Sequence, residues 1–578
     1  MTVYDPAVGS GGFLIQAHQY VEEQGQNAED MFLYGQESNG TTWAISMMNM
    51  LLHNVTKFQL ENGDVIEEPL ILDGGTYRKF DRVLANPPFS QNYSRASLKF
   101  ENRFKEFCTE TGKKADFMFV QHMIASLKRD GMMATIMPHG VLFRGGKEKL
   151  IREILLDDDV IEAIIGLPPN LFYGTGIPAC ALVINKNKPD ELRDKIFFIN
   201  ADAEYAEGKN QNKLRPEDIE KIDYVFTNKL EIPKYSRLID KRTIVEDHDH
   251  NLNIRRYVDN TPEPEPEDVQ AHLIGGVPVV EVDSRQGEFD KFGIDAGLIF
   301  EADRKDYYRF KPGIEDRADI RRIIESSPSL QETYDKMSAA LNGWWKVAQN
   351  DFAKLEGNNI LPEVRSELMQ TLKDKLVPIG VLDEFKSAGV FVNWWQTIRY
   401  DLKTIISIGW SHVLITDEYL IAAFFQDIAD ELADLEARLG EAESQLEEAI
   451  EAVEYEPDED ETVSAASLKK YLKSLIDDFE GSKAASAVKE RELCEEQRQA
   501  IVDAENLKRE ISGAIRSKRF ELEIKLSLKR HGADAEKQDA NLLLRQIDRQ
   551  LAVSLPKTKS DNIDGEVHPG GAQFGKCR

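Results

Sequence analysis

The chain has 578 residues, of which 41% are apolar and 9% aromatic, as expected for a globular protein of three or four domains. No apolar run reaches the ~18 residues of a membrane span, and the N-terminus lacks a signal-peptide pattern, so we expect no membrane association. The four cysteines are scattered without C-x-x-C spacing. This excludes a disulfide framework or a zinc site and favours a reducing, cytoplasmic location with no bound metal.

The net charge of −30 is unevenly distributed. Residues 427–461 hold sixteen acids and one Arg, which accounts for about half of the imbalance. Residues 95–149 hold eleven Lys or Arg and six acids. A local basic surface can bind phosphates even in an acidic chain, but overall acidity predicts weak DNA binding by the isolated protein.

The chain opens with a short apolar strand, Val3-Tyr4-Asp5, followed by a Gly-rich turn and an apolar helix start. Glycines at such a strand–helix junction let a ligand approach the backbone closely. The run alone is also compatible with an ordinary flexible turn. Our candidate cofactor-binding residues here are Asp5, Gly9, Ser10, Gly11, Gly12 and Phe13.

Two acids follow the next strand-like segments. Glu37 ends the second apolar run, about 25 residues after the Gly-rich turn, where a doubly wound fold binds ribose hydroxyls. Asp64 follows a third run, and we expect it to contact the adenine amine of a cofactor. Each acid alone is more typical of a solvated turn, but the order of turn, acid and Gly-Asp supports a nucleotide-like ligand.

The tetrapeptide Asn86-Pro87-Pro88-Phe89 closes a fourth strand-like run. The Asn side-chain oxygen and the Pro87 carbonyl can both accept hydrogen bonds from one planar NH2 group, and two prolines fix φ and remove competing donors. Phe89 offers a flat face for an aromatic base. The tetrapeptide therefore predicts methylation of an exocyclic amine such as that of adenine.

This order of motifs resembles the modification subunit of type I restriction–modification systems, a family of DNA adenine-N6 methyltransferases. The resemblance covers roughly the first 260 residues. Besides the motifs above, it rests on Gly35-Gln36-Glu37, Asp116-Phe117-Met118-Phe119, Pro138-His139-Gly140, Leu171-Phe172-Tyr173-Gly174 and Asn251-Leu252-Asn253-Ile254.

The resemblance implies a cytoplasmic enzyme that uses S-adenosyl-L-methionine as methyl donor, and DNA and a specificity subunit as partners. A nuclease subunit and a second modification subunit are further expected partners. In this family a long helical N-terminal domain normally precedes the Gly-rich turn. Met1 stands four residues before Asp5, so we expect that domain to be absent from this chain.

The expected chemistry needs neither a metal nor a covalent enzyme intermediate. Hydrogen bonds from the adenine amine to Asn86 Oδ1 and the Pro87 carbonyl would orient its lone pair for in-line attack on the methyl group. A paired base must first be extruded from the duplex, at a cost of a few kcal/mol. Phe89 is expected to stack on the extruded base, and by resemblance Phe172 on its other face; a core role for Phe172 is the rival interpretation. His122 and His139 are expected to be structural.

The first ~200 residues alternate strands and helices, with strands predicted at 2–5, 32–37, 57–61, 81–85, 131–137, 160–167 and 179–185. We therefore predict an α/β fold, a Rossmann-like class I methyltransferase domain over 1–235, followed by a mostly helical C-terminal extension. A Pro/Glu-rich linker is expected over 236–269, a mainly helical extension over 270–425 and a disordered tail over 553–578.

Coiled-coil-like helices are predicted over 426–552. Apolar residues repeat at alternating four- and three-residue steps from Ile428 to Val453, and a second series runs from Leu493 to Ala514. An acidic break at 457–461 separates them. The two helices either fold back on each other as an antiparallel hairpin or pair with partner helices, and two ordinary amphipathic helices are an equal alternative.

Two other functions remain open from the sequence. The same tetrapeptide occurs in enzymes that methylate protein glutamine amides or RNA guanine amines. The chain is also compatible with an inactive or incomplete fragment that acts as an assembly subunit. The C-terminal extension favours the restriction–modification interpretation, because small protein methylases do not need it.

Overall fold

The computed structural model describes residues 1–104, 112–172, 176–261, 268–357, 360–410, 414–455 and 463–531. They form two compact units, the first ending at Ile406 and the second beginning at Ser407. The predicted tail over 553–578, the Pro/Glu-rich part of the predicted linker and the acidic break lie outside the described residues. In the described part of the chain, every helix is too short or too polar to span a lipid bilayer.

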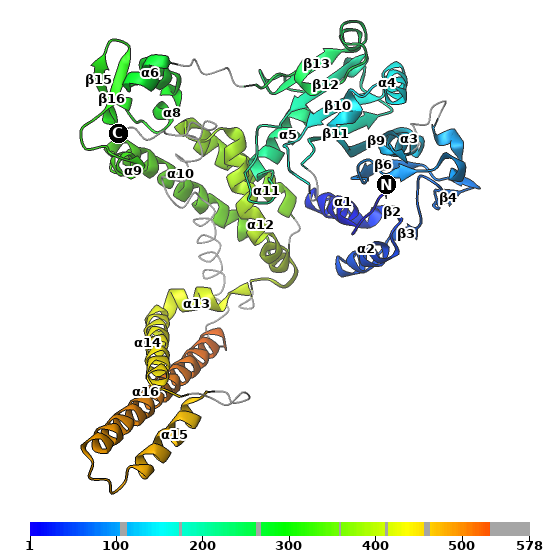
Figure 1. The fold of residues 1–578 in the computed structure, drawn as a ribbon. Coiled ribbons are helices and arrows are strands. Elements are labelled where there is room, and N and C mark those ends of the chain that lie inside the picture. The colour runs from blue at the N-terminus through cyan, green and yellow to red at the C-terminus, as the bar shows by residue number, and fades with distance from the viewer. Residues whose placement is uncertain are drawn as a thin grey trace. The chain divides into compact units, whose positions relative to one another are not determined.

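The first unit is built on a nine-stranded sheet (Figure 1). Its strand order is β13-β12-β10-β11-β9-β6-β1-β2-β3. The strands are β1 Thr2–Asp5, β2 Phe32–Glu37, β3 Phe58–Asn62, β6 Phe80–Ala85, β9 Leu127–Pro138, β10 Ile161–Gly166, β11 Ala179–Asn185, β12 Lys195–Asn200 and β13 Ser236–Asp240. Two short hairpins lie outside this sheet: β4 Leu72–Asp73 with β5 Thr76–Tyr77, and β7 Asn92–Tyr93 with β8 Gly112–Lys113.

All seven predicted strands are present, and they take the spatial order 3-2-1-4-5-7-6 when numbered along the chain. The first five are parallel, and β11 is inserted antiparallel between β9 and β10. The order differs from the Rossmann order 3-2-1-4-5-6 by this one insertion. The predicted Rossmann-like class I fold is therefore confirmed.

Alternating residues of each strand bury opposite faces of the sheet. Val3 and Leu33 pack with helices α1 (Gly12–Glu23) and α2 (Gly40–Leu52). Tyr4 and Tyr34 belong to the opposite cluster, with α3 (Asp116–Ala125) and α4 (Lys147–Asp157). Helix α5 (Pro216–Asn228) covers β10 and β12 through Val225. The result is a three-layer α/β domain.

The sheet domain continues into the segment that the sequence assigned to a linker from residue 236. β13 pairs antiparallel with β12, and Leu252, Ile254 and Tyr257 are buried in the core beneath α4 and β12. Because these apolar side chains lose their exposure only by packing back on the sheet, the folded domain extends at least to Val258. Strand β12 was also missed, although its apolar run Ile196–Ile199 is a strand signal.

Residues 268–406 add a small sheet and a helical bundle to the first unit. The small sheet has the order β14-β16-β15. The strands and helices are α6 Val269–Ile274, β14 Val277–Pro278, α7 Val279–Ser284, α8 Gln286–Lys291, β15 Phe300–Arg304, β16 Tyr307–Phe310, α9 Arg317–Glu325, α10 Pro328–Phe352, α11 Leu361–Leu376 and α12 Glu384–Ile408. Both tryptophan pairs are buried between α10 and α12, with Trp344 and Trp394 at 0% exposure and their ring centroids 5.5 Å apart. Trp344-Trp345 and Trp394-Trp395 are therefore packing anchors.

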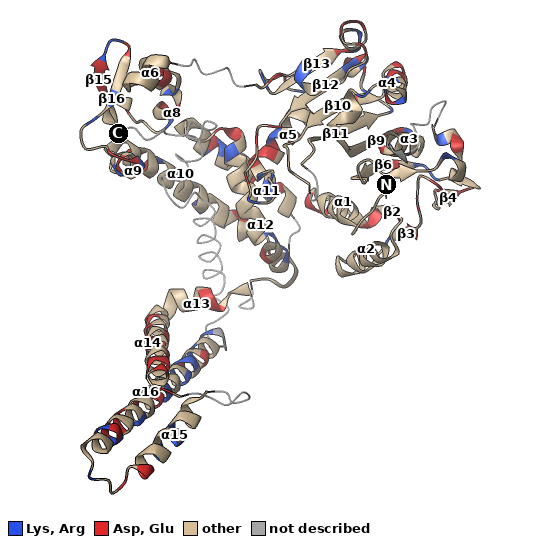
Figure 2. Cartoon of the chain, in the orientation of Figure 1, with Lys and Arg blue, Asp and Glu red and all other residues tan. Residues whose placement is uncertain are grey.

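In the second unit the two heptad helices pack against each other. It contains α13 Asp417–Phe424, α14 Gln426–Glu451, α15 Ala465–Asp478 and α16 Ala485–His531. Leu435 and Leu439 of α14 share a cluster with Ile511 and Ile515 of α16. Acidic residues of α14 face basic residues of α16 (Figure 2), with Glu443 bonded to Lys508 at 2.9 Å and Glu431 to Lys518 at 2.5 Å. The higher-numbered acid pairs with the lower-numbered base, so the pair is an antiparallel hairpin.

We expect Ile511→Val to lower the free energy of unfolding of this hairpin by about 0.5–1.5 kcal/mol, because it removes one buried methyl group. Ile524→Val in the same helix is the control, since Ile524 is 44% exposed. Urea unfolding followed by helical circular dichroism measures both. Equal losses in the two variants would contradict an internally packed hairpin.

Candidate active site

Four predicted site segments meet at one edge of the large sheet. Asp5 and Glu37 are the last residues of β1 and β2, Asp64 lies two residues after β3, and Asn86 directly follows β6. These four strands are adjacent and parallel, so their carboxyl ends lie together. β1 lies between β2 and β6, where the strand order reverses, which is where doubly wound sheets bind ligands.

The Gly-rich turn is fixed by backbone hydrogen bonds and leaves one side open. The Val8 N–H donates to the Gln36 carbonyl at 3.1 Å, and the Gly11 N–H to the Val8 carbonyl at 2.9 Å. Gly9 and Gly11 have φ of 55° and 90°, in the left-handed region. A Cβ at Gly9 or Gly12 would meet nothing within 4 Å, and Ser10 and Phe13 are exposed. The turn therefore presents open backbone to a ligand.

Gly11 is required by its conformation. We expect Gly11→Ala to lower the free energy of unfolding by about 1–2 kcal/mol, because a Cβ is disfavoured at φ 90° and would lie 3.1 Å from Met50 Cε. The neighbouring Gly12→Ala has neither problem and should retain or gain stability. Chemical denaturation distinguishes them, and equal stability of the two variants would refute the conformational argument.

Glu37 joins the Gly-rich turn to the start of α2. Its Oε2 accepts a hydrogen bond from the Gly9 N–H at 3.0 Å, and its Oε1 accepts from the Asn39 N–H at 2.9 Å. Oε1 also accepts from Ser38 Oγ at 3.5 Å, whereas Oε2 keeps a second lone pair with which Glu37 can accept from a ligand.

Asp5 is a buried acid with one hydrogen bond, from the Ala7 N–H to Oδ1 at 2.9 Å. Asp5 is only 1% exposed to solvent. Burial, with the nearby Glu37 charge adding to it, raises the pKa of Asp5 from 3.8 to about 7. A cationic ligand group beside Asp5 would restore its charge.

Asp64 caps its own turn. Its Oδ1 accepts from the Ile66 N–H at 2.8 Å, and its Oδ2 accepts from Gln91 Nε2 at 3.3 Å. Gln91 comes directly from the segment that follows the tetrapeptide. The segment after β3 and the segment after β6 are thus joined.

The tetrapeptide is anchored at both ends while its Asn stays free. Thr135 Oγ1 donates to the Ala85 carbonyl at 3.1 Å, and the Ser90 N–H donates to Asp116 Oδ1 at 2.8 Å. Asp116 is buried and its other oxygen pairs with Arg144 at 3.1 Å. The Asn86 side chain is exposed and has no hydrogen-bond partner among the described residues. Thr135 was not predicted as a site residue. Its only indication in the sequence is its place in the alternating pattern of β9, which puts it on the same buried face as Met133 and Met137.

Phe172 lies against Phe89, with ring centroids 6.3 Å apart and an interplanar angle of 74°. A base between two rings needs parallel rings about 7 Å apart, twice the ordinary contact distance. The two rings touch edge to face, so a base can enter only after Phe172 moves. Phe172 is half-buried and also packs on the cluster under α5.

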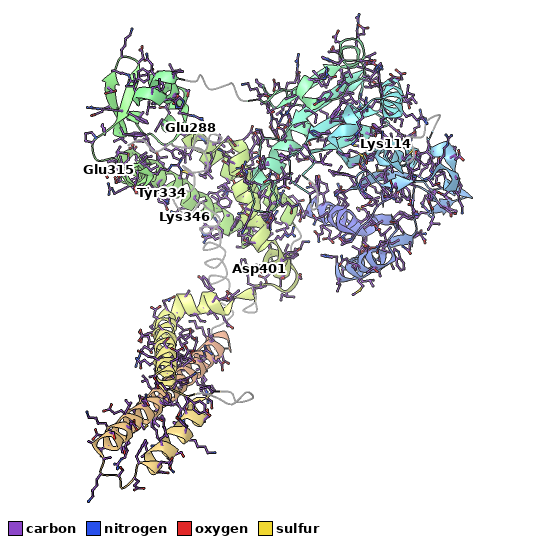
Figure 3. The ribbon with its side chains drawn as sticks, viewed as in Figure 1. Lys114, Glu288, Glu315, Tyr334, Lys346 and Asp401 are labelled. Carbon is purple, nitrogen blue, oxygen red and sulfur yellow. The ribbon has the colours of Figure 1, made fainter. Side chains whose placement is uncertain are left out.

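Much of the basic stretch 95–149 is paired within the domain. Lys99 pairs with Glu68, Lys128 with Asp81 and Arg144 with Asp116, each at 2.5–3.1 Å. Lys114, labelled in Figure 3, lies two residues before the start of α3. The stretch is therefore less basic at the surface than its composition indicates. Among the described residues, no three His, Cys, Asp or Glu side chains are arranged to hold a metal ion.

Comparison with known proteins agrees with this geometry. Residues 1–266 match the family model described as N-6 DNA Methylase.

Curated proteins similar to this chain carry type I restriction names. The type I restriction enzyme MjaVII methylase subunit of Methanocaldococcus jannaschii is 36% identical over 284 residues, covering 47% of this chain and 48% of the relative. The MpnII methylase subunit of Mycoplasma pneumoniae is 34% identical over 278 residues, covering 46% and 50%. A solved type I methyltransferase subunit from Streptococcus thermophilus is 39% identical, covers 45% of this chain and 54% of that chain, and has a TM-score of 0.41. The chain spans about half the length of the curated relatives it matches.

Proposed function

We propose that this chain transfers a methyl group from S-adenosyl-L-methionine to the N6 amine of an extruded adenine in DNA. It would act as the modification subunit of a type I restriction–modification complex. One observation carries the proposal. Asn86, exposed and without a hydrogen-bond partner in the part of the chain that the structure describes, directly follows β6, beside the open Gly-rich turn at the end of β1, in a segment that matches the N-6 DNA Methylase model.

The residues around the Gly-rich turn fit S-adenosyl-L-methionine. Open backbone at Gly9 and Gly12 admits the ligand, and Ser10, Gly11 and Phe13 shape the same turn. Glu37 has a lone pair free for a ribose hydroxyl, and Asp64 for the adenine amine. The buried Asp5 carboxyl is suited to a ligand that carries positive charge, as this methyl donor does on its ammonium and sulfonium groups.

Asn86 and Pro87 would position the acceptor amine. Bound S-adenosyl-L-methionine supplies an electrophilic methyl group on its sulfonium sulfur. Asn86 Oδ1 and the Pro87 carbonyl each accept a hydrogen bond from one N6–H group of the adenine. These bonds point the nitrogen lone pair at that methyl group and stabilise the positive charge that develops on the nitrogen. Pro88 restricts the backbone and Phe89 stacks on the base. As the N–CH3 bond forms, the S–CH3 bond breaks and its electron pair stays on sulfur, so that S-adenosylhomocysteine leaves and the methylated amine loses a proton to water.

Neither His122 nor His139 is needed as a base in this reaction. His122 is buried, and burial together with the Arg103 charge holds its pKa well below the usual value. It is bonded to Tyr4 Oη at 3.1 Å and to Arg103 at 3.0 Å. No metal takes part in the proposed step.

Target recognition would be supplied by partners. Ion pairs made by basic residues of the 95–149 stretch and the net charge of −30 favour weak DNA binding by the chain alone. A specificity subunit would bring the DNA, with a nuclease subunit and a second modification subunit as further partners. We assign methyl transfer to the sheet domain and assembly to the helical regions.

Radiolabelled S-adenosyl-L-methionine tests the proposal when it is offered with adenine-containing duplex DNA, RNA and protein in separate reactions, with and without a specificity subunit. Label on DNA N6 supports it. Label on protein or RNA alone would favour amide or guanine methylation instead, and no transfer in any reaction would favour an assembly subunit.

A further inference from the structure

The strongest feature outside the proposed chemistry is Arg103, an arginine that is 1% exposed in a short helical turn, Glu101–Phe104. All five of its N–H groups are used. Nε donates to the Phe100 carbonyl at 3.2 Å, and Nη2 to the Ile66 and Lys99 carbonyls at 2.7 and 2.8 Å. Nη1 donates to the Val65 carbonyl at 2.8 Å and to His122 Nδ1 at 3.0 Å.

These acceptors come from three separate site segments. Val65 and Ile66 directly follow Asp64, on the proposed cofactor side. Lys99 and Phe100 belong to the segment 90–104 that follows the Asn86 tetrapeptide. His122 lies on α3, whose first residue, Asp116, anchors Ser90. One guanidinium therefore joins the segment after β3, the segment after β6 and α3.

The network also reaches β1. Because Arg103 can only donate, His122 Nδ1 must accept, and the His122 proton resides on Nε2 and is donated to Tyr4 Oη at 3.1 Å. Tyr4 precedes Asp5 and stacks on Phe80 at the start of β6, with ring centroids 4.3 Å apart. The buried chain Tyr4–His122–Arg103 thus lies behind both halves of the site.

Other contacts also connect the segments after β3 and β6: Gln91 Nε2 donates to Asp64 Oδ2 at 3.3 Å, and Val65 and Ile66 share a hydrophobic cluster with Leu98 and Phe104. The Lys99–Glu68 pair has side chains 60% and 40% exposed, and exposed ion pairs contribute little, typically 0–1 kcal/mol. Arg103 adds buried hydrogen bonds to these contacts, and buried, fully satisfied polar groups fix one arrangement strongly. A change in the segment after Asp64 must therefore move residues 90–104 or break these bonds.

We propose that Arg103 is a positioning residue that couples the cofactor half of the site to the target-base half, so that a ligand bound at Asp64 also orders residues 90–104 behind Asn86. The inference rests on the proposed function, since it takes S-adenosyl-L-methionine as the ligand at Asp64. The coupling gives an order to the reaction: Asn86 and Pro87 reach the arrangement that binds the base only after the methyl donor is bound.

Hydrogen exchange on the full chain, with and without saturating S-adenosylhomocysteine, tests the coupling without turnover. In the unsubstituted protein the ligand should slow exchange at residues 5–12, 62–68 and 90–104, by up to about 100-fold at 100 times Kd. The Lys99 N–H is a direct reporter, because it donates to the Glu67 carbonyl at 2.7 Å.

Arg103→Lys keeps the charge but replaces the planar fork by a single nitrogen, which cannot reach both pairs of carbonyls. We expect ligand-induced slowing to persist at 5–12 and to be lost at 90–104. Arg129→Lys, at an exposed position of β9, should behave like the unsubstituted protein. If Arg103→Lys also speeds exchange at the β1 and β6 amides without ligand, the variant is unfolding, and His122→Ala is used in its place. His122→Ala removes one of the five acceptors of Arg103 and should partly reduce the ligand-induced slowing at 90–104.

The outcomes separate the two proposals. No slowing at 5–12 in the unsubstituted protein would refute the cofactor site and the coupling with it. Slowing at 5–12 without slowing at 90–104 would refute the coupling alone. Undiminished slowing at 90–104 in Arg103→Lys would show that Arg103 does not carry it.

Discussion

Asn86→Ala is expected to lower kcat for methyl transfer by about 10²- to 10³-fold while leaving S-adenosyl-L-methionine affinity unchanged. The reason is that Asn86 Oδ1 would contact the amine in the transition state, whereas the residues around the Gly-rich turn bind the cofactor. The exposed Asn86 amide has no partner among the described residues, so its removal breaks no bond of the folded protein.

Single-turnover transfer to DNA by the assembled complex measures this rate, and calorimetry measures cofactor affinity. Asn187→Ala is the matched control, because Asn187 is exposed and lies in the turn after β11, away from the carboxyl ends of β1 and β6. Full activity of Asn86→Ala would overturn the catalytic assignment. Loss of cofactor affinity together with activity would show that Asn86 belongs to the cofactor pocket instead.

Asp5→Asn should stabilise the unliganded protein at pH 8 and weaken its binding of S-adenosyl-L-methionine. Burial raises the pKa of Asp5 to about 7, so the folded protein holds this proton up to about pH 7, whereas the unfolded chain releases it near pH 4. Between these values the folded state binds more protons, so the free energy of unfolding falls as pH rises, by up to about 4 kcal/mol in total. An Asn keeps the acceptor for the Ala7 N–H and removes this cost.

Cofactor binding has the opposite pH dependence to folding stability. A positive ligand group near Asp5 favours the ionised carboxylate, so affinity should rise by up to about tenfold per pH unit from pH 5 to 7 and level off above. Calorimetry across this range should show proton release on binding in the unsubstituted protein and a flat profile in Asp5→Asn. Asp73→Asn, an exposed acid in β4, is the control. An affinity that does not change with pH in the unsubstituted protein would show that Asp5 does not lie beside a charged group of the ligand.

The sequence predicted seven of the strands, and the strand ends at which the candidate site residues lie, because each is encoded locally. Apolar runs ended by Asp5, Glu37 and Asn86 identify strands and their carboxyl ends, and a parallel sheet brings such ends together. Short segments with weaker local signals were missed. β13 and residues up to Val258 follow a polar stretch, and only their packing against β12 and α4 makes them part of the domain.

The pairing of the heptad helices also needed the tertiary structure. The spacing of Leu435 and Leu439 requires an apolar partner but does not choose between a partner chain and this one. Ion pairs such as Glu443–Lys508 and the shared cluster with Ile511 select the antiparallel hairpin. Phe172 is a similar case, because its sequence motif gives it a role but only the structure shows it in contact with Phe89.

The amino-acid sequence by itself determined the chemistry available to this protein: a Gly-rich turn, two acids and an Asn-Pro-Pro-Phe clamp, each specified by residues adjacent along the chain. The tertiary structure decided how these groups depend on one another. Asp116 and the Arg103 network join residues tens of positions apart. Their hydrogen bonds, and the desolvation of Asp5, arise only once the sheet and its helices have excluded water.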